Sequence, residues 1–260
     1  MKNPMDCIRL LTGLSLKTIK KLAELLKKPF EPSGPCRGRR FRWPLETQLL
    51  LFLCKLRMNL PYRLMESLFG FCFKSIHRAV LRIAKRLAGL ASCEAPSHCN
   101  YLIVDGTVVR FATTKSGFFT GYKKLHVLKL QAIVSDNLNF IRISPAYQGS
   151  FHDFKVFKLE RTSMGFLDDC SLPLIGDKAY QGMQNLYENA QPLSKKSERL
   201  HRKMPTFHAL ANKALSKMRV KIEHFFAQLK AFQIFQYFRG KIENFDRFAK
   251  CMEIILCTAT

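Results

Sequence analysis

Apolar residues recur every three or four positions along the first third of the chain. The pattern is clearest in two groups, Ile19, Leu22, Leu25 and Leu26, and Leu45, Leu49, Leu50 and Leu53. This spacing gives an α-helix one apolar face, and nothing before about residue 90 alternates as a strand does. The sequence therefore predicts an all-helical region over residues 1–95.

Within this region, residues 62–87 have the spacing of a helix-turn-helix. Tyr62–Phe69 and Lys74–Leu87 are predicted helices, and the Gly70-Phe-Cys segment between them predicts a tight turn. In a DNA-binding unit of this kind the second helix enters the major groove. Its candidate contacts are Lys74, His77, Arg78 and Arg82. An ordinary helical hairpin has the same spacing, so the pattern alone leaves both interpretations open.

A basic connector, PCRGRRFR at 35–42, separates the first predicted helix from the rest of this region. It is rich in Gly and Pro, which favours a loop or arm. Arg37, Arg39 and Arg40 within it are candidates to follow a DNA backbone. A solvated basic loop explains the segment equally well.

Beyond about residue 100 the periodicity changes from helix to strand. Tyr101–Phe111, Leu125–Ser135 and Asn139–Pro145 are apolar runs rich in β-branched residues and predict a three-stranded meander. A helix is predicted over Phe151–Leu159 and a short strand over Leu172–Ile175. A long helix follows from about residue 209, so residues 96–260 are expected to form one α/β domain.

The net charge of the chain indicates what kind of partner it binds. The chain of 260 residues carries 43 Lys and Arg against 19 Asp and Glu, a formal charge of +24, which favours nucleic acid as the partner. The longest apolar run, Leu49–Cys54, is far shorter than the roughly 18 residues that cross a bilayer. The N-terminus has no signal-peptide core. We therefore expect a cytoplasmic, nucleoid-associated protein with no membrane partner.

Two acidic residues interrupt or end the apolar runs that predict buried strands. Asp105 lies within the first strand and Asp177 follows the last. Buried carboxylates are costly unless they are paired or bind a cation, and carboxylate oxygens suit Mg²⁺. Glu223 on the long helix is the best candidate for a third ligand. An exposed ion pair with Arg219, four residues earlier, is the alternative role for Glu223.

Five successive motifs carry a family resemblance. They are VDGT at 104–107, GYKKLH at 121–126, GSFHD at 149–153, GDKAY at 176–180 and RVKIEHFF at 219–226. Together and in this order they resemble the motifs of DDE-superfamily transposases, with the insertion-sequence-five family of bacteria and the related Harbinger elements most similar. The likeness extends to Asn212–Lys217, Phe232–Arg239 and the helical region before Asp105.

The resemblance implies a fold, a reaction and a set of ligands. The fold would be a ribonuclease-H-like mixed five-stranded sheet flanked by helices, preceded by the helix-turn-helix. Asp105, Asp177 and Glu223 would be the catalytic triad and would hold two Mg²⁺ ions, for which Mn²⁺ can substitute. The helical region would recognise the terminal inverted repeats of an insertion sequence in double-stranded DNA. Cleavage at the element ends would precede attack of the freed 3′-hydroxyl on target DNA, in a synaptic homo-oligomer.

Other residues of the motifs have supporting roles under this resemblance. Lys123, Lys124 and Lys178, with Lys129, would attract phosphates near the acids. Arg219 would orient Glu223 or hold DNA. His152 and Asp153 begin a helix beside the expected site, where they would position DNA or a metal-bound water. Capping of that helix by Asp153 is an equally good explanation.

Two rival functions remain at this stage. One is an inactive, truncated or domesticated copy that binds DNA without cutting it; the intact set of three acids argues against it. The other is an HD-type metallophosphohydrolase built on His152 and Asp153. That class is mostly helical and needs further spaced ligands, whereas this region is predicted to be rich in strands.

Overall fold

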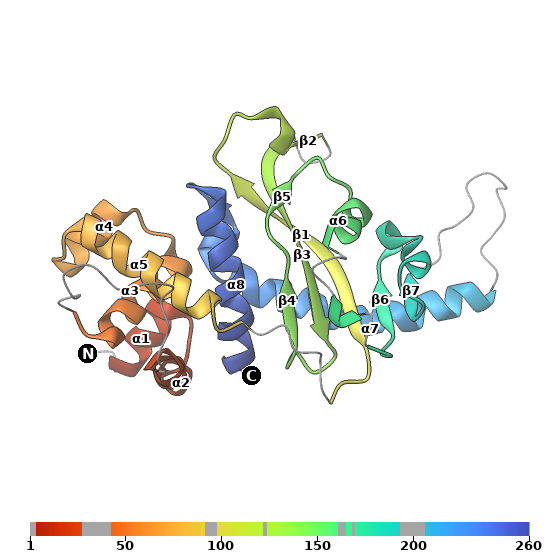
Figure 1. Ribbon diagram of the computed structural model, residues 1–260, viewed down its shortest axis with the longest axis horizontal. Helices are drawn as coiled ribbons and strands as arrows, with labels where there is room; N and C mark the ends of the chain where they lie inside the picture. Colours follow the sequence, from red (N-terminus) through yellow and green to blue (C-terminus); the bar gives the residue numbers. More distant parts are fainter. Residues whose placement is uncertain are drawn as a thin grey trace. The chain divides into compact units, whose positions relative to one another are not determined.

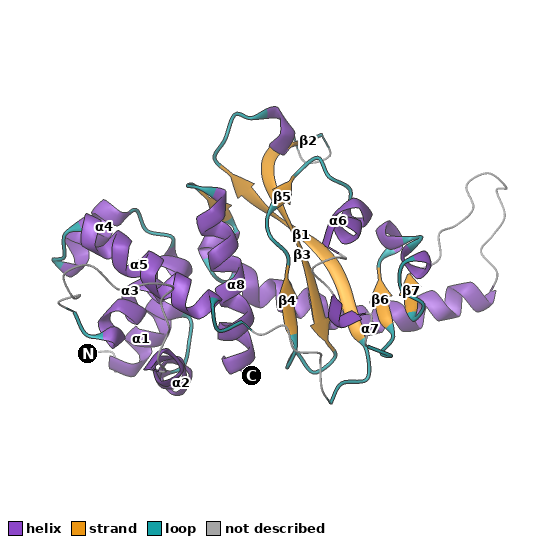
Figure 2. Cartoon of the chain, in the orientation of Figure 1, coloured by secondary structure: helices purple, strands orange, loops and turns teal. Residues whose placement is uncertain are grey.

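The computed structural model describes residues 4–27, 43–91, 98–121, 124–160, 165–167, 170–192 and 206–259, which fall into two compact units (Figures 1 and 2). The first unit joins residues 1–92 with residues 229–260, and the second comprises residues 93–228. None of the described helices is long and apolar enough to cross a membrane.

The first unit is helical. Its helices are α1 (Pro4–Thr12), α2 (Leu16–Lys27), α3 (Leu45–Met58), α4 (Tyr62–Phe69), α5 (Phe73–Ala88) and α8 (Ile242–Ala259), with a short strand β8 (Tyr237–Phe238). The α4 helix ends where Gly70 adopts φ 70° and its N–H donates to the Glu66 carbonyl. The predicted helices at 62–69 and 74–87 therefore form where the sequence placed them. The basic connector with Arg37, Arg39 and Arg40 lies outside the described residues.

The C-terminal helix α8 belongs to this helical unit. It packs against α5 and α2, and its Cys251 thiol lies 3.2 Å from the Ala84 carbonyl of α5. Phe245, Phe248 and Met252 bury its apolar face. The sequence predicted one α/β domain over residues 96–260. The compact units instead group residues 229–260 with the N-terminal helices, because α2 and α5 cover the apolar face of α8.

The second unit is built on a mixed sheet. Its strands are β1 (Leu102–Phe111), β2 (Phe119–Thr120), β3 (Leu125–Ser135), β4 (Ile141–Ile143), β5 (Tyr147–Gln148), β6 (Leu174–Gly176) and β7 (Ala190–Pro192). Along the sheet the order is β2-β3-β1-β6-β7, and β4 and β5 also pair with β3. The β1 strand is antiparallel to β3 and parallel to β6, which is parallel to β7. The predicted meander and final strand are present, whereas the sequence did not predict the short strands β2, β5 and β7.

Two helices accompany this sheet, α6 (Asp153–Glu160) and α7 (Thr206–Lys230). Side chains alternate between the two faces of a strand, so Leu102 and Val104 of β1 share one face. There they form a core with Phe157 of α6 and with Tyr180. Asp105 points to the opposite face, where α7 contributes Arg219. The two helices therefore meet β1 from opposite sides (Figure 1).

Candidate active site

Asp105 and Asp177 come from two adjacent parallel strands. Val104 of β1 is in register with Gly176 at the end of β6, so Asp105 is the next residue of β1 and Asp177 is the first residue after β6. Their side chains are 22% and 40% exposed. This register brings the two acids to the same level of the sheet, where both side chains are partly exposed.

The Arg219 guanidinium joins the two carboxylates. Its Nη2 lies 2.6 Å from Asp105 Oδ2 and its Nη1 lies 3.4 Å from Asp177 Oδ1. The other carboxylate oxygen of Asp105 accepts a hydrogen bond of 2.7 Å from the Gly106 N–H. Burial raises the pKa of Asp105 above its ordinary value, and the charge of Arg219 opposes that shift. The site is thus a carboxylate pair stabilised by one cationic side chain.

Glu223 lies one turn after Arg219 on α7, and its side chain is exposed. Over the described residues, no three His, Cys, Asp or Glu side chains lie close enough to hold one metal ion. The structure therefore brings together two of the three predicted acids. It does not form the alternative ion pair between Arg219 and Glu223, because Arg219 reaches toward Asp105 and Asp177 instead.

The donor set fits a hard divalent cation. Two carboxylates already share one positive charge at this point of the sheet, and Mg²⁺ usually takes only one or two protein carboxylates together with water and substrate phosphates. Asp105 and Asp177 are the residues that would hold such an ion. Glu223 is the nearest acid along α7 that could join them.

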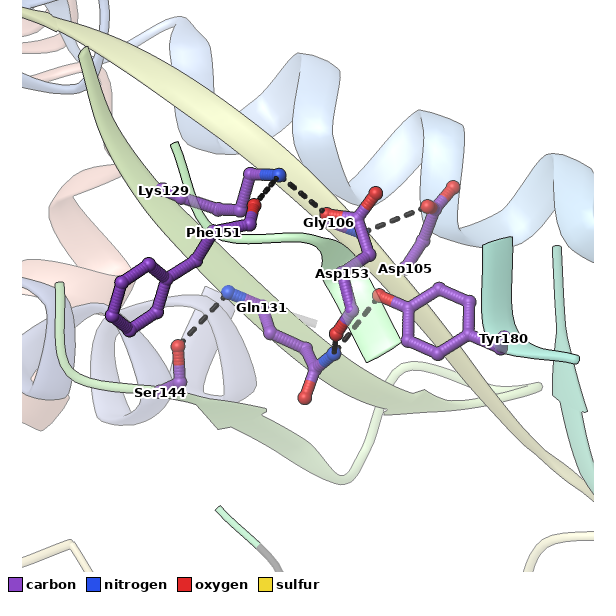
Figure 3. A network of polar contacts seen from close by, with 8 residues as sticks. All are labelled: Asp105, Gly106, Lys129, Gln131, Ser144, Phe151, Asp153 and Tyr180. Carbon is purple, nitrogen blue, oxygen red and sulfur yellow. Dashed lines mark hydrogen bonds and ion pairs between the residues drawn. The ribbon is translucent and has the colours of Figure 1, made fainter. Parts of the chain in front are cut away.

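Asp153 occupies the other face of β1. A Cβ added at Gly106 would lie 2.7 Å from Asp153 Oδ1. Neighbouring residues of a strand face opposite sides of the sheet, so Asp153 lies on the side opposite to Asp105. The Asp153 carboxylate pairs with Lys129 of β3 at 3.1 Å (Figure 3). Asp153 is also the first residue of α6, where the helix dipole stabilises a negative charge. Its place in the fold is thus behind the carboxylate pair rather than within it.

A buried polar network lies behind the carboxylate pair, and the apolar pattern of the chain did not predict it. The Nε2 of Gln131 in β3 donates two hydrogen bonds, one of 2.9 Å to the Tyr180 hydroxyl and one of 3.4 Å to the Asp153 carbonyl (Figure 3). Gln131 and Tyr180 are both buried. Burial, with the nearby negative charges of Asp153 and Asp105, raises the pKa of Tyr180 well above its ordinary value. Tyr180 belongs to the GDKAY motif, whereas Gln131 is a single polar residue in an apolar run and carried no signal.

The remaining predicted residues are scattered over both units. Lys124, Lys178 and His152 are exposed, and Lys123 lies outside the described residues. On α5, Lys74, Arg78 and Arg82 are exposed. The His77 ring packs edge-on against Tyr62 with a centroid distance of 4.9 Å, so it contributes to the packing of α4 on α5.

The sequence also missed a row of lysines on α7. Lys213, Lys217 and Lys221 recur every four residues and are exposed. At about 100° per residue, this row lies on a different side of the helix from Arg219 and Glu223. The spacing itself was the available signal, because it places like charges on one exposed side of a predicted helix.

Comparison with known proteins identifies similar sequences. Residues 104–259 match the model of a family described as DDE superfamily endonuclease. A protein of Microchaete diplosiphon described as a probable transposase for insertion sequence element IS702 is 25% identical over 238 residues, which cover 86% of this chain and 83% of that protein. No solved structure matches significantly.

Proposed function

The chain belongs to the DDE superfamily endonucleases, and we propose that it is the transposase of an insertion sequence, which binds and cuts the ends of that element and joins them to target DNA. The observation that carries the proposal is that Asp105 and Asp177 directly follow the register partners Val104 and Gly176 and share the Arg219 guanidinium. The similarity to a probable transposase over most of both chains supports it.

The proposed triad is Asp105, Asp177 and Glu223. Endonucleases of this superfamily use divalent metal ions, and two Mg²⁺ ions, when bound, supply activation of the attacking oxygen and stabilisation of the leaving oxygen. The Asp105 and Asp177 carboxylates would hold these ions. Glu223 needs a change of side-chain position to join them, because α7 presents Arg219 to the acids. The strand order of the sheet supports a ribonuclease-H-like fold for this domain.

Basic side chains supply the DNA contacts in this proposal. Lys178 is next to Asp177 and is exposed, so it is placed to attract the phosphate that is cut. The helix pair α4 and α5 acts as the helix-turn-helix that reads the terminal inverted repeats. Two ends must be cut and joined together, so the active form is a homo-oligomer that holds both ends. The HD-type alternative is disfavoured because the unit that contains His152 and Asp153 is built on a sheet.

Nicking of a plasmid that carries the flanking sequences of the gene tests the proposal. The full chain is compared with Asp105→Asn, Asp177→Asn and Glu223→Gln, with Mg²⁺ or Mn²⁺ and with neither. We expect metal-dependent cuts at the element ends that all three variants lose, while binding of the ends in a gel-shift assay persists. The amide variants remove metal ligation and leave the basic surface intact.

The matched control is Glu243→Gln, which removes an exposed acid at the start of α8. It should cut as the unmodified chain does. If the unmodified chain binds the ends and never cuts them, the protein is an inactive copy that acts through DNA binding alone. If only Glu223→Gln retains cutting, the third ligand is another residue.

A further inference from the structure

Arg219 is a largely buried arginine whose side chain contacts two acids. Its side chain is 13% exposed, and its two terminal nitrogens reach two different carboxylates, at 2.6 Å and 3.4 Å. Its Nε is buried and has no hydrogen-bond partner among the described residues. A guanidinium can donate five hydrogen bonds in a planar fork, so Arg219 is held by charge while part of its donor capacity remains unused.

This guanidinium lies where a divalent cation would have to bind. Two carboxylates that share a half-buried site repel each other unless a positive charge lies between them, and Arg219 provides that charge. A Mg²⁺ ion binds carboxylate oxygens at about 2.0–2.1 Å, closer than the guanidinium approaches Asp105. Both cations cannot occupy the same oxygens, because their charges repel at that separation.

We propose that Arg219 is a positioning residue that holds Asp105 and Asp177 together until a divalent cation displaces it from the carboxylates. This inference rests on the metal site of the proposed function and adds an ordered exchange of one cation for another. The long 3.4 Å contact with Asp177 and the unpartnered Nε favour exchange, because the 2.6 Å hydrogen bond to Asp105 is the one short contact with the acids that is lost when the side chain turns away.

The position of Arg219 on α7 links this exchange to Glu223. The two residues are four apart, so they lie on the same side of the helix with a rise of roughly 6 Å between them. While Arg219 occupies the acids, Glu223 stays exposed and makes no contact with them. Withdrawal of Arg219 opens the side of Asp105 that faces α7, which is the side from which Glu223 can approach. The exchange therefore accounts for a third acid that lies outside the carboxylate pair.

Metal binding by the full chain without DNA tests the exchange. Mn²⁺ alone is titrated calorimetrically into the unmodified protein and into Arg219→Gln, and the melting temperature of each is measured with and without the ion. We expect Arg219→Gln to bind Mn²⁺ roughly tenfold more tightly, because the competing cation is gone. Without metal it should melt at a lower temperature than the unmodified chain, and Mn²⁺ should raise its melting temperature by more.

Three variants make the result specific. Lys221→Gln removes the same charge from an exposed position on another side of α7 and should leave the Mn²⁺ affinity unchanged. Asp105→Asn should abolish the binding, which shows that the measured site is this one. Arg219→Lys keeps the positive charge but loses the planar guanidinium that reaches both acids, so it should bind Mn²⁺ with intermediate affinity. This variant serves as the test if Arg219→Gln does not fold.

Equal or weaker Mn²⁺ binding by the Arg219 variants overturns the inference, as does equal tightening by Lys221→Gln or an absence of binding by every form. These outcomes leave the transposase proposal open, because that proposal depends on cutting of the element ends. A protein that never cuts DNA but binds Mn²⁺ more tightly after Arg219→Gln would retain the exchange and lose the proposed function.

Discussion

Gly106 of β1 lies directly against Asp153 in the first turn of α6. An added Cβ would lie 2.7 Å from Asp153 Oδ1 and 3.3 Å from its Cγ, both shorter than ordinary contacts. Asp153 cannot withdraw freely, since its carboxylate pairs with Lys129. Glycine at this position therefore lets a helix carboxylate pack directly on the strand that carries Asp105.

We expect Gly106→Ala to lower the free energy of unfolding by about 1–3 kcal/mol, as overpacking of a tight contact does. Urea denaturation followed by fluorescence gives the value. Gly121→Ala is the control, because an added Cβ there meets nothing within 4 Å. Equal stability of the two variants would show that Asp153 moves aside without cost.

Lys55 is a second residue whose surroundings affect stability, through a lowered pKa. Its ammonium donates to the Leu60 carbonyl at 2.8 Å and to Asn59 Oδ1 at 3.1 Å, where α3 ends. Burial lowers its pKa from 10.5 to about 8. Between these values the unfolded chain binds the proton more often than the folded chain, so stability rises with pH across this range.

We expect the Lys55 contribution to raise the free energy of unfolding by about 2 kcal/mol between about pH 7 and pH 10. Lys55→Met should lack this rise, and Lys20→Met, at an exposed position on α2, should keep it. The measurement is urea denaturation at several pH values in that interval. A rise of the same size in Lys55→Met would assign the pH dependence to other groups.

At the scale of single elements, α5 separates its apolar and basic residues most clearly. Ile76, Ala79, Val80 and Ile83 are fully buried, whereas Lys74, Arg78 and Arg82 are exposed on the same helix. The exposed side of α5 presents basic side chains to solvent, while its buried apolar side packs in the core of the helical unit. This arrangement is what a helix needs in order to rest against a phosphate backbone.

Replacement of Lys74 and Arg78 by Gln should weaken binding to the element ends. Each lost phosphate contact reduces the slope of log affinity against log salt by about one. The slope is obtained from fluorescence anisotropy with labelled duplex over a series of salt concentrations. Lys20→Gln on α2 is the control, at another exposed position of the same unit. An unchanged slope in the double variant would remove α5 from the DNA interface.

At the scale of the whole molecule, the charge of +24 dominates the expected behaviour. A protein with this excess should bind random duplex DNA through counterion release, with an affinity that falls steeply with salt. We expect a loss of roughly a thousandfold or more between about 50 and 200 mM salt. Asp105→Asn should bind random duplex as the unmodified chain does, because it adds only one unit to the net charge. Salt-independent binding measured by anisotropy would contradict this view.

The apolar pattern of the chain was sufficient to place most regular elements. The helices at 62–69 and 73–88 and the strands β1 and β3 lie within one residue of the predicted bounds. Local sequence decides these elements, because the period of the apolar residues fixes which backbone conformation can bury them. The short strands β2, β5 and β7 were missed, since strands of two or three residues have too few positions to show a period.

The sequence by itself also determined the candidate acids and the family resemblance, because motif residues are read directly from the chain. Tertiary structure alone decided which groups meet. It joined α8 to the N-terminal helices, placed Asp153 behind β1, and put Arg219 rather than Glu223 against Asp105 and Asp177. The physical reason is the same in each case. Contacts between residues distant in sequence depend on strand register and on which side of a helix faces the sheet, and neither is fixed until the elements pack.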